Sequence, residues 1–271
     1  MSTIVSWSPV HGQGANTTNT VALASAMAFD NSYKALLTYT QFDNSPLESI
    51  FNEDKEGQFD DKGFGALGRL VKSNLLKEDA IIDYTDTIIR NRLDFLPGNQ
   101  RNIEEEYHEK VWRSVLAIAK SSYELTWVDA YSGKRNFITS TLLSEADLVI
   151  VNLPQNAHVL DLFFNGDLIP EELLFTRYMI IIGQYDEKSS LSLKNIKRKY
   201  RVKVPIYSIP YFTAYKDAFN NQRTQEFFYR AVKSVKKDYS YHFMNEVRMI
   251  NKQIKKELQL DKAEKEDEDW S

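Results

Sequence analysis

The sequence contains no cysteine, which excludes disulfide bonds, thiolate metal sites and a catalytic thiol. It also lacks any run approaching the ~20 apolar residues that cross a bilayer as a helix. Residues 1–7 have neither the basic region nor the long apolar region of a secretory signal. The four histidines show no metal-ligand spacing, so a dedicated zinc site is not expected. We therefore expect a cytoplasmic protein without a transmembrane segment.

Neither sign of charge is in large excess. Lys and Arg number 34 against 38 Asp and Glu, so the formal net charge of −4 gives no general attraction to nucleic acid or anionic lipid. One local exception is the basic run at residues 194–203. Such a run is usually the solvated face of a helix, and contact with DNA, an acidic partner or lipid is the alternative. No recognition pattern is interleaved with it, so DNA binding is not favoured.

The hydrophobic pattern indicates one fold class. The chain has 271 residues, 42% of them hydrophobic, and its apolar runs alternate with amphipathic segments. This is typical of βαβ units, and we predict an α/β fold with a mostly parallel sheet and helices on both faces. The predicted strands are residues 3–7, 34–40, 80–84, 93–96, 124–128, 148–152, 177–182 and 205–209. The predicted helices are residues 17–29, 65–76, 103–121, 137–145, 159–164, 192–200 and 224–236.

The pattern changes at the C-terminal end. From Tyr241 onward, apolar residues mark one narrow face of a Lys-rich helix, and residues 261–269 form an acidic tail. We therefore divide the chain into an α/β domain, residues 1–238, and a C-terminal helix with its tail, residues 239–271. The helix either caps the domain, which is the ordinary interpretation, or docks a partner.

A Gly-containing turn, residues 8–18, lies between the first predicted strand and the first predicted helix. In a P-loop such a turn wraps phosphates with backbone N–H groups, while a Lys reaches the terminal phosphates and a Ser or Thr holds Mg²⁺. Gly12 and Gly14 permit a close backbone turn here, and Asn16 and Thr17 can cap the helix. The backbone pattern of a phosphate loop is therefore present.

The residue types with which a P-loop binds phosphate and magnesium are replaced in this turn. With Gly14 as the last glycine of G-x-x-x-x-G-K-[ST], Pro9 replaces the first glycine, Ala15 the lysine and Asn16 the magnesium hydroxyl. His11 can donate to a phosphate, although a surface polar role is more usual. The turn is consistent with a nucleotide site and equally with a structural connection between strand and helix.

Further segments follow in a definite order. Residues 124–128 lead into Asp129 and, four residues later, Gly133, so an acid stands at the carboxyl end of a strand, where α/β sheets place ligand-binding groups. A helix-capping Asp is the ordinary alternative. The apolar runs at residues 148–154, 179–185 and 206–211 then end in polar or Pro-containing turns.

In these features the first ~230 residues resemble the ParA/MinD family of partitioning and positioning ATPases. The resemblance rests on the deviant loop, the D-x-x-x-G turn at Asp129 and Gly133, the A-D-L-V-I-V strand and the I-P segment before a terminal helix. The resemblance implies a P-loop NTPase-like three-layer sandwich, a homodimer, and ATP with Mg²⁺ as cofactors. Within the family the chain looks most like degenerate members, among them the TadZ-type proteins that mark sites of pilus assembly.

The departures from the family pattern concern hydrolysis. Val10 occupies the place of the signature lysine that reaches across the dimer, and Tyr39 and Gln41 replace both aspartates of the second strand. Each lost stabiliser of a transition state costs ~2.7–4 kcal/mol of barrier lowering, so we expect impaired ATP turnover. Binding through backbone amides and the helix dipole is less affected.

By the same resemblance, Gln184 and residues 210–213 lie where the family holds adenine, and Tyr211 can stack on the base; aromatic closure of the sheet edge is the alternative. No catalytic or metal residue is assigned. The expected nucleotide-binding residues are His11, Gly12, Gln13, Gly14, Ala15, Asn16, Thr17, Asp129, Gln184, Pro210 and Tyr211.

The leading hypothesis is a non-catalytic or weakly catalytic scaffold that localises a partner machine of pilus assembly, secretion or conjugation. The second is an active partitioning-type ATPase in which His11 or Lys134 supplies charge and Asp129 retains magnesium. The third is an interaction module whose loop binds nothing.

Overall fold

The computed structural model describes residues 1–41, 45–51, 62–77, 80–98, 107–133 and 137–260. The strands in these ranges are β1 Ser2–Trp7, β2 Ala35–Tyr39, β3 Asp86–Ile89, β4 Leu93–Phe95, β5 Leu125–Asp129, β6 Leu148–Pro154, β7 Tyr178–Tyr185 and β8 Ile206–Pro210. The α-helices are α1 Asn16–Asp30, α2 Pro46–Phe51, α3 Gly63–Lys72, α4 His108–Ser122, α5 Phe137–Glu145, α6 Ala157–Phe164, α7 Leu193–Tyr200, α8 Thr213–Asn220, α9 Thr224–Ala231 and α10 Tyr241–Leu258.

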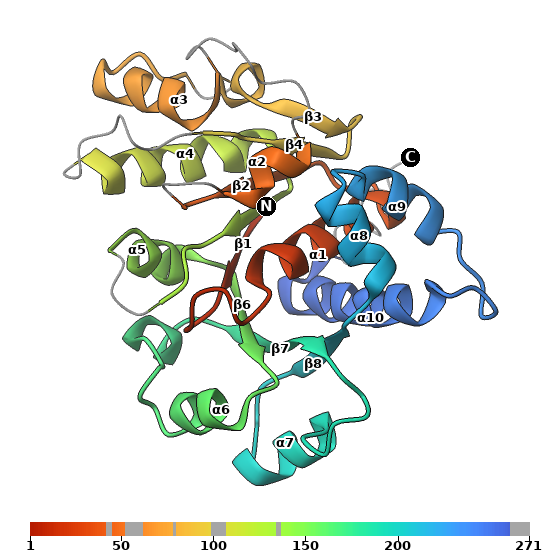
Figure 1. Cartoon of the computed structure of the whole chain (residues 1–271). Coiled ribbons are helices and arrows are strands. Elements are labelled where there is room, and N and C mark those ends of the chain that lie inside the picture. The colour runs from red at the N-terminus through yellow and green to blue at the C-terminus, as the bar shows by residue number, and fades with distance from the viewer. Residues whose placement is uncertain (42–44, 52–61, 78–79, 99–106, 134–136, 261–271) are drawn as a thin grey trace.

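The strands form one sheet in the order β3-β4-β2-β5-β1-β6-β7-β8. Every pairing is parallel except that of β3 with β4. Chain connections leave β1 toward β2 on one side, and β6 lies on its other side, so the carboxyl end of β1 is a switch point of the sheet (Figure 1). The predicted α/β fold with a mostly parallel sheet is confirmed.

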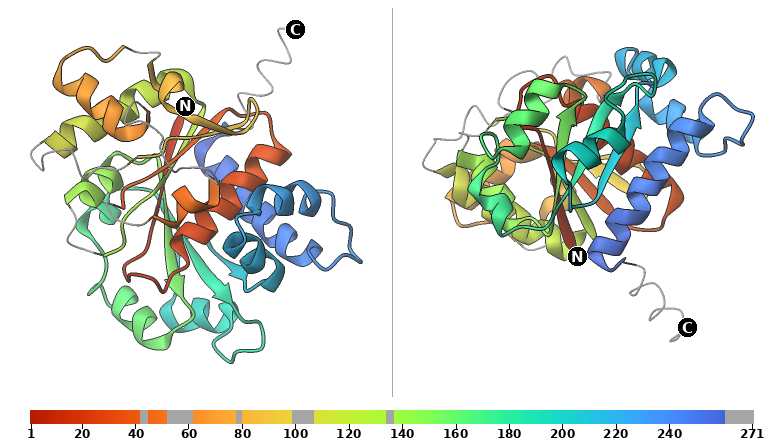
Figure 2. Two further views of the ribbon diagram at one scale, coloured as in Figure 1. Left: turned by 45° about the horizontal axis from the view of Figure 1, so that its top comes forward. Right: turned by 90° about the horizontal axis from the view of Figure 1, so that it is seen from below.

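Helices cover both faces of the sheet, as predicted. Alternate residues of each buried strand point to opposite faces, so that in β6 Leu148 and Ile150 belong to one core cluster and Val149 and Val151 to the other. The first cluster contains side chains of α1, α8, α9 and α10, and the second those of α3, α4, α5, α6 and α7. Figure 2 shows α10 and α5 on opposite sides of the sheet.

The prediction of a strand at residues 80–84 is wrong. Ala80–Tyr84 is a short 3-10 helix in which only Ile81 is buried, whereas the prediction required an apolar run buried within the sheet. The strand at this edge is β3, which the sequence analysis missed because its residues are half-buried or exposed and form no apolar run. The short helices α2 and α8 were also missed. The start predicted for the helix at 103–121 lies outside the described residues, and α4 begins at His108.

Helix α10 is packed into the first core cluster. It contacts α1 and β8, and the side chains of Phe243, Met244, Val247, Ile250 and Ile254 are almost completely buried. Arg248 adds an ion pair to Asp30 at the end of α1, with its Nε 2.7 Å from Oδ2. This helix therefore shares its core with the helix that starts at the Gly-containing turn. The acidic tail lies outside the described residues.

Within the described ranges, none of the helices combines the length and the apolar character that crossing a membrane requires.

Candidate functional site

The turn between β1 and α1 lies at the carboxyl edge of the sheet, and its two glycines are needed for different reasons. Gly12 has a φ of +70°, a left-handed conformation that costs little only for glycine, and an added Cβ would meet nothing within 4 Å. Gly14 lies against the sheet, where a Cβ would stand 2.4 Å from Ser8 Oγ and 2.6 Å from the Asn152 carbonyl oxygen. Gly12 therefore shapes the turn, and Gly14 lets it pack onto β6.

The side chain of Asn16, the first residue of α1, is hydrogen-bonded within the protein. Its side-chain amide donates to Asp129 Oδ1 at 2.6 Å and to the carbonyl oxygens of Ser6 and Ala130 at 3.1 and 3.2 Å. Its Oδ1 accepts from Asn152 Nδ2 at 2.7 Å and from Ser6 Oγ at 3.0 Å. Both polar ends of the Asn16 side chain are thus satisfied by neighbouring strands.

Asp129 is the one buried acid of this site in the described residues. Thr17 Oγ1 donates to its Oδ2 at 2.7 Å, opposite the bond from Asn16. Burial raises the pKa of the Asp129 carboxyl to about 7, although the hydrogen bonds from Thr17 and Asn16 act in the other direction. A carboxyl in this environment carries little charge below neutral pH.

Asn152 and Asn19 complete the network, and the sequence analysis missed both. Asn152 is fully buried on β6, and its Oδ1 accepts from Asn19 Nδ2 at 2.8 Å. A signal was available, because an amide inside the apolar run at residues 148–153 needs buried hydrogen-bond partners. Together these amides hold the turn to β1, β5 and β6.

A polar pocket of about 380 Å³ opens above the turn. It brings together seven of the predicted residues from three separate parts of the chain: His11, Gly12, Ala15, Asn16, Thr17, Asp129 and Gln184. Tyr131 also lines it, with its ring centroid 5.7 Å from that of His11. Gln41 lines it too.

An aromatic pocket of about 230 Å³ continues from the polar one, because Thr18, Gln184 and Phe219 line both. The predicted Pro210 and Tyr211 line this second space.

Two predicted residues do not face either pocket. Gln13 is exposed beside the turn, and Gly14 is buried beneath it. Lys134, suggested as a substitute cation, lies outside the described residues.

No protein-family model and no curated protein sequence matches this chain. Solved structures do. A ParA family ATPase from Chlorobium tepidum TLS superposes with a TM-score of 0.69 at 13% identity, covering 91% of this chain and 95% of its own. The chain has the fold of ParA and MinD ATPases.

Two further neighbours contain nucleotide. MinD from Pyrococcus horikoshii OT3, complexed with Mg-ADP, has a TM-score of 0.66 at 14% identity, with 95% of this chain and 99% of that chain covered. An ATP complex of a McdA variant from Cyanothece has a TM-score of 0.67 at 14% identity and covers 96% of each chain. These likenesses establish the ParA/MinD-like fold.

The residues present fit part of a magnesium nucleotide. Two contiguous pockets, one polar and one aromatic, suit phosphates and a base, and the backbone N–H groups of Gly12 and Gly14 have no acceptor among the described residues. Magnesium fits poorly, since Asn16 and Thr17 already bond Asp129, and no group of three or more acids and histidines that could hold a metal occurs in the described part of the chain. Among the described residues that line the polar pocket, none is a Lys or an Arg.

Proposed function

We propose that this chain is a positioning scaffold of ParA/MinD type, which binds a nucleotide weakly through backbone amides and does not hydrolyse it at a useful rate. Its role is to localise a partner machine, for which pilus assembly, secretion and conjugation are the candidates. The ParA/MinD-like fold supports the class of protein. The neutral polar pocket supports the loss of catalysis.

The observation that carries the proposal is the hydrogen-bond network of Asn16, Asp129 and Asn152. In phosphoryl transfer the protein acts by positioning and by stabilising charge, with cations and a bound metal ion. Here the loop is held in shape by neutral amides, and the positions of both lysines hold Val10 and Ala15. The site keeps the loop's shape without the charges that cleave a triphosphate.

Restoring the lysine tests the proposal. Ala15 is at φ 56°, so the variant Ala15→Lys pays no more for this left-handed backbone than alanine does. A new charge-assisted hydrogen bond is worth about 1.5–3 kcal/mol, and we therefore expect ATP affinity to rise roughly ten- to hundredfold in calorimetric titration. Ala15→Gln, which has similar size and no charge, is the matched control and should bind like the wild type.

ATP turnover decides between the scaffold and an active enzyme. We expect the wild type to release no phosphate above the background of Asp129→Asn, with or without Mg²⁺. A magnesium-dependent rate in the wild type that is lost in Asp129→Asn or His11→Ala would instead support an ATPase with substitute residues.

A further inference from the structure

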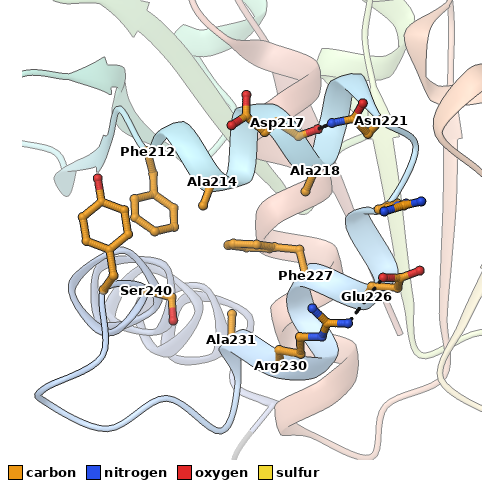
Figure 3. A pocket seen from close by; sticks show the side chains of 12 residues that line it. Phe212, Ala214, Asp217, Ala218, Asn221, Glu226, Phe227, Arg230, Ala231 and Ser240 are labelled. Carbon is orange, nitrogen blue, oxygen red and sulfur yellow. Dashed lines mark hydrogen bonds and ion pairs between the residues drawn. The ribbon is translucent and has the colours of Figure 1, made fainter.

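A groove separate from the two nucleotide pockets lies on the opposite side of α8. It has a volume of about 420 Å³ and is formed by α8, α9 and the start of α10. In Figure 3, Phe227 points between α8 and α9, with the small side chains of Ala214, Ala218 and Ala231 around it. Phe212 and Tyr239 form one end, and Tyr239 is 76% exposed. We call this the α8–α9 groove.

The rim of the groove carries basic side chains that are available to a ligand. Arg230 is 3.7 Å from Glu226, and both side chains are largely exposed, so this pair is worth little. Arg223 has no ion-pair partner in the part of the chain that the structure describes. Residues 211–240 contain six basic and three acidic residues in a chain whose net charge is −4. The groove lining itself is charge-balanced, since Asp217 and Glu226 line it together with Arg223 and Arg230, and the excess of basic residues belongs to the surrounding segment.

The sequence itself contains a segment with the complementary chemistry. Residues 261–271 have six acidic residues, two lysines and Trp270, and their net charge of −4 equals that of the whole chain. An indole is a frequent anchor in an apolar groove, and acidic neighbours raise the association rate and the specificity for a surface that carries arginines. These eleven residues lie outside the described part of the chain.

The reach of the residues after α10 decides whether residues 261–271 can bind the groove of their own chain. Helix α10 begins at the groove, which its N-cap residue Ser240 lines, and its 18 residues, Tyr241–Leu258, extend about 27 Å at 1.5 Å per residue. The ten residues that follow Leu260, up to Trp270, reach at most about 33–36 Å. Trp270 can therefore return to its own groove only along an almost fully extended path, which is entropically costly. The same segment of a second copy of the chain can reach the groove without such an extended path.

We propose that the α8–α9 groove binds residues 261–271 of a second copy of this chain, with the Trp270 indole against Phe227 and the acidic residues facing Arg223 and Arg230. The contact joins two different surfaces, so it either closes reciprocally into a dimer or continues from copy to copy. It does not depend on the state of the nucleotide pockets.

The binding test uses a fluorescent synthetic peptide of residues 261–271 and the full-length Trp270→Ala chain as receptor, in nucleotide-free buffer. We expect saturable anisotropy that weakens with salt. Ala214→Glu or Arg223→Glu in the receptor, or Trp270→Ala in the peptide, should weaken binding at least tenfold. Both receptor sites are exposed, so these variants should keep the wild-type melting temperature. Arg198→Glu on α7 changes an exposed arginine in the same way and is the control.

Sedimentation of the full-length protein shows whether residues 261–271 bind the groove of their own chain or that of a second copy. The wild type should self-associate, and Trp270→Ala and Arg223→Glu should each shift it toward the monomer. Mixing the two variants should restore association, since one retains an intact groove and the other an intact segment. Absence of peptide binding, or equal binding by the Arg223→Glu receptor, would overturn the proposal. A monomeric wild type that binds the peptide only when Trp270 is removed would show docking within one chain, and would overturn the second-copy assignment.

Discussion

Asp129 and Asn16 show how two side chains set the chemistry of the turn after β1. The Asn16 side-chain amide donates directly to the buried acid, with its Nδ2 2.6 Å from Asp129 Oδ1. The acid then needs no metal ion to satisfy its oxygens, and burial raises its pKa to about 7. A site in this state favours a protonated or amide-bonded carboxyl over a bound cation.

The raised pKa of Asp129 predicts a pH dependence of stability. In the unfolded chain an Asp has a pKa of about 3.9, so between that pH and about 7 the folded protein keeps a proton that the unfolded chain releases. The contribution of this group is therefore complete below pH 4 and is lost as the pH rises to about 7, with a slope of up to about 1.4 kcal/mol per pH unit.

Urea denaturation at pH 5, 6 and 8 measures this effect. The free energy of unfolding of the wild type, relative to Asp129→Asn, should decrease between pH 5 and 8. Asp83→Asn changes an exposed carboxyl and should leave the pH profile of the wild type intact. A wild-type profile parallel to that of Asp129→Asn would show that the carboxyl is already ionised in the folded state.

At the scale of elements, two helices connect the C-terminal part of the chain with the turn. Tyr215 of α8 donates its hydroxyl to the Thr18 carbonyl oxygen in α1 at 2.7 Å, and α10 packs along α1. One face of α8 therefore lines the aromatic pocket, and the other lines the α8–α9 groove.

Removing one buried contact of α10 tests whether the helix is essential to the fold. Ile250 is fully buried against the first core cluster, and Ile250→Ala should lower the free energy of unfolding by about 2–5 kcal/mol. Lys252→Ala, on the exposed side of the same helix, should change it by less than about 0.5 kcal/mol. Denaturant melts compare the two, and a cost below 1 kcal/mol for Ile250→Ala would mean that α10 is only loosely attached.

At the scale of the whole molecule, the turn rests on the middle of the sheet. β1 has parallel partners on both sides, β5 and β6, and its residues from Ile4 to Trp7 are fully buried. β3 lies at the edge, is antiparallel and pairs only with β4 in the described sheet. The hydrogen bonds that hold the turn therefore join it to the strands that open least readily.

Hydrogen exchange followed by mass spectrometry checks this gradient. Amides of β1, β5 and β6 should exchange on the order of a thousandfold or more slowly than those of β3, because central strands open only with the whole sheet. Ile250→Ala should reduce protection in β1, β5 and β6 alike, because these strands open with the whole sheet, and should change that of β3 little. Protection of β3 equal to that of β1 would contradict this view of the fold.

The sequence by itself determined the fold class, because the fold class depends on local signals. Apolar runs such as residues 148–153 indicate strands covered on both faces, and a Gly-containing turn after the first strand of a parallel sheet lies at its carboxyl edge. The assignment of nucleotide-binding residues to that turn stays a prediction. The exposed edge strand β3 and the short helix α8 gave no such signal.

Only the tertiary structure decided how the turn after β1 is held in place. Asn19, Asn152 and Asp129 are far apart in the chain, and their hydrogen bonds exist because β1, β5 and β6 are neighbours in the sheet. The α8–α9 groove likewise exists only where three helices converge. Burial and long-range pairing set the pKa of Asp129 and the shape of that groove, and neither quantity belongs to any short stretch of sequence.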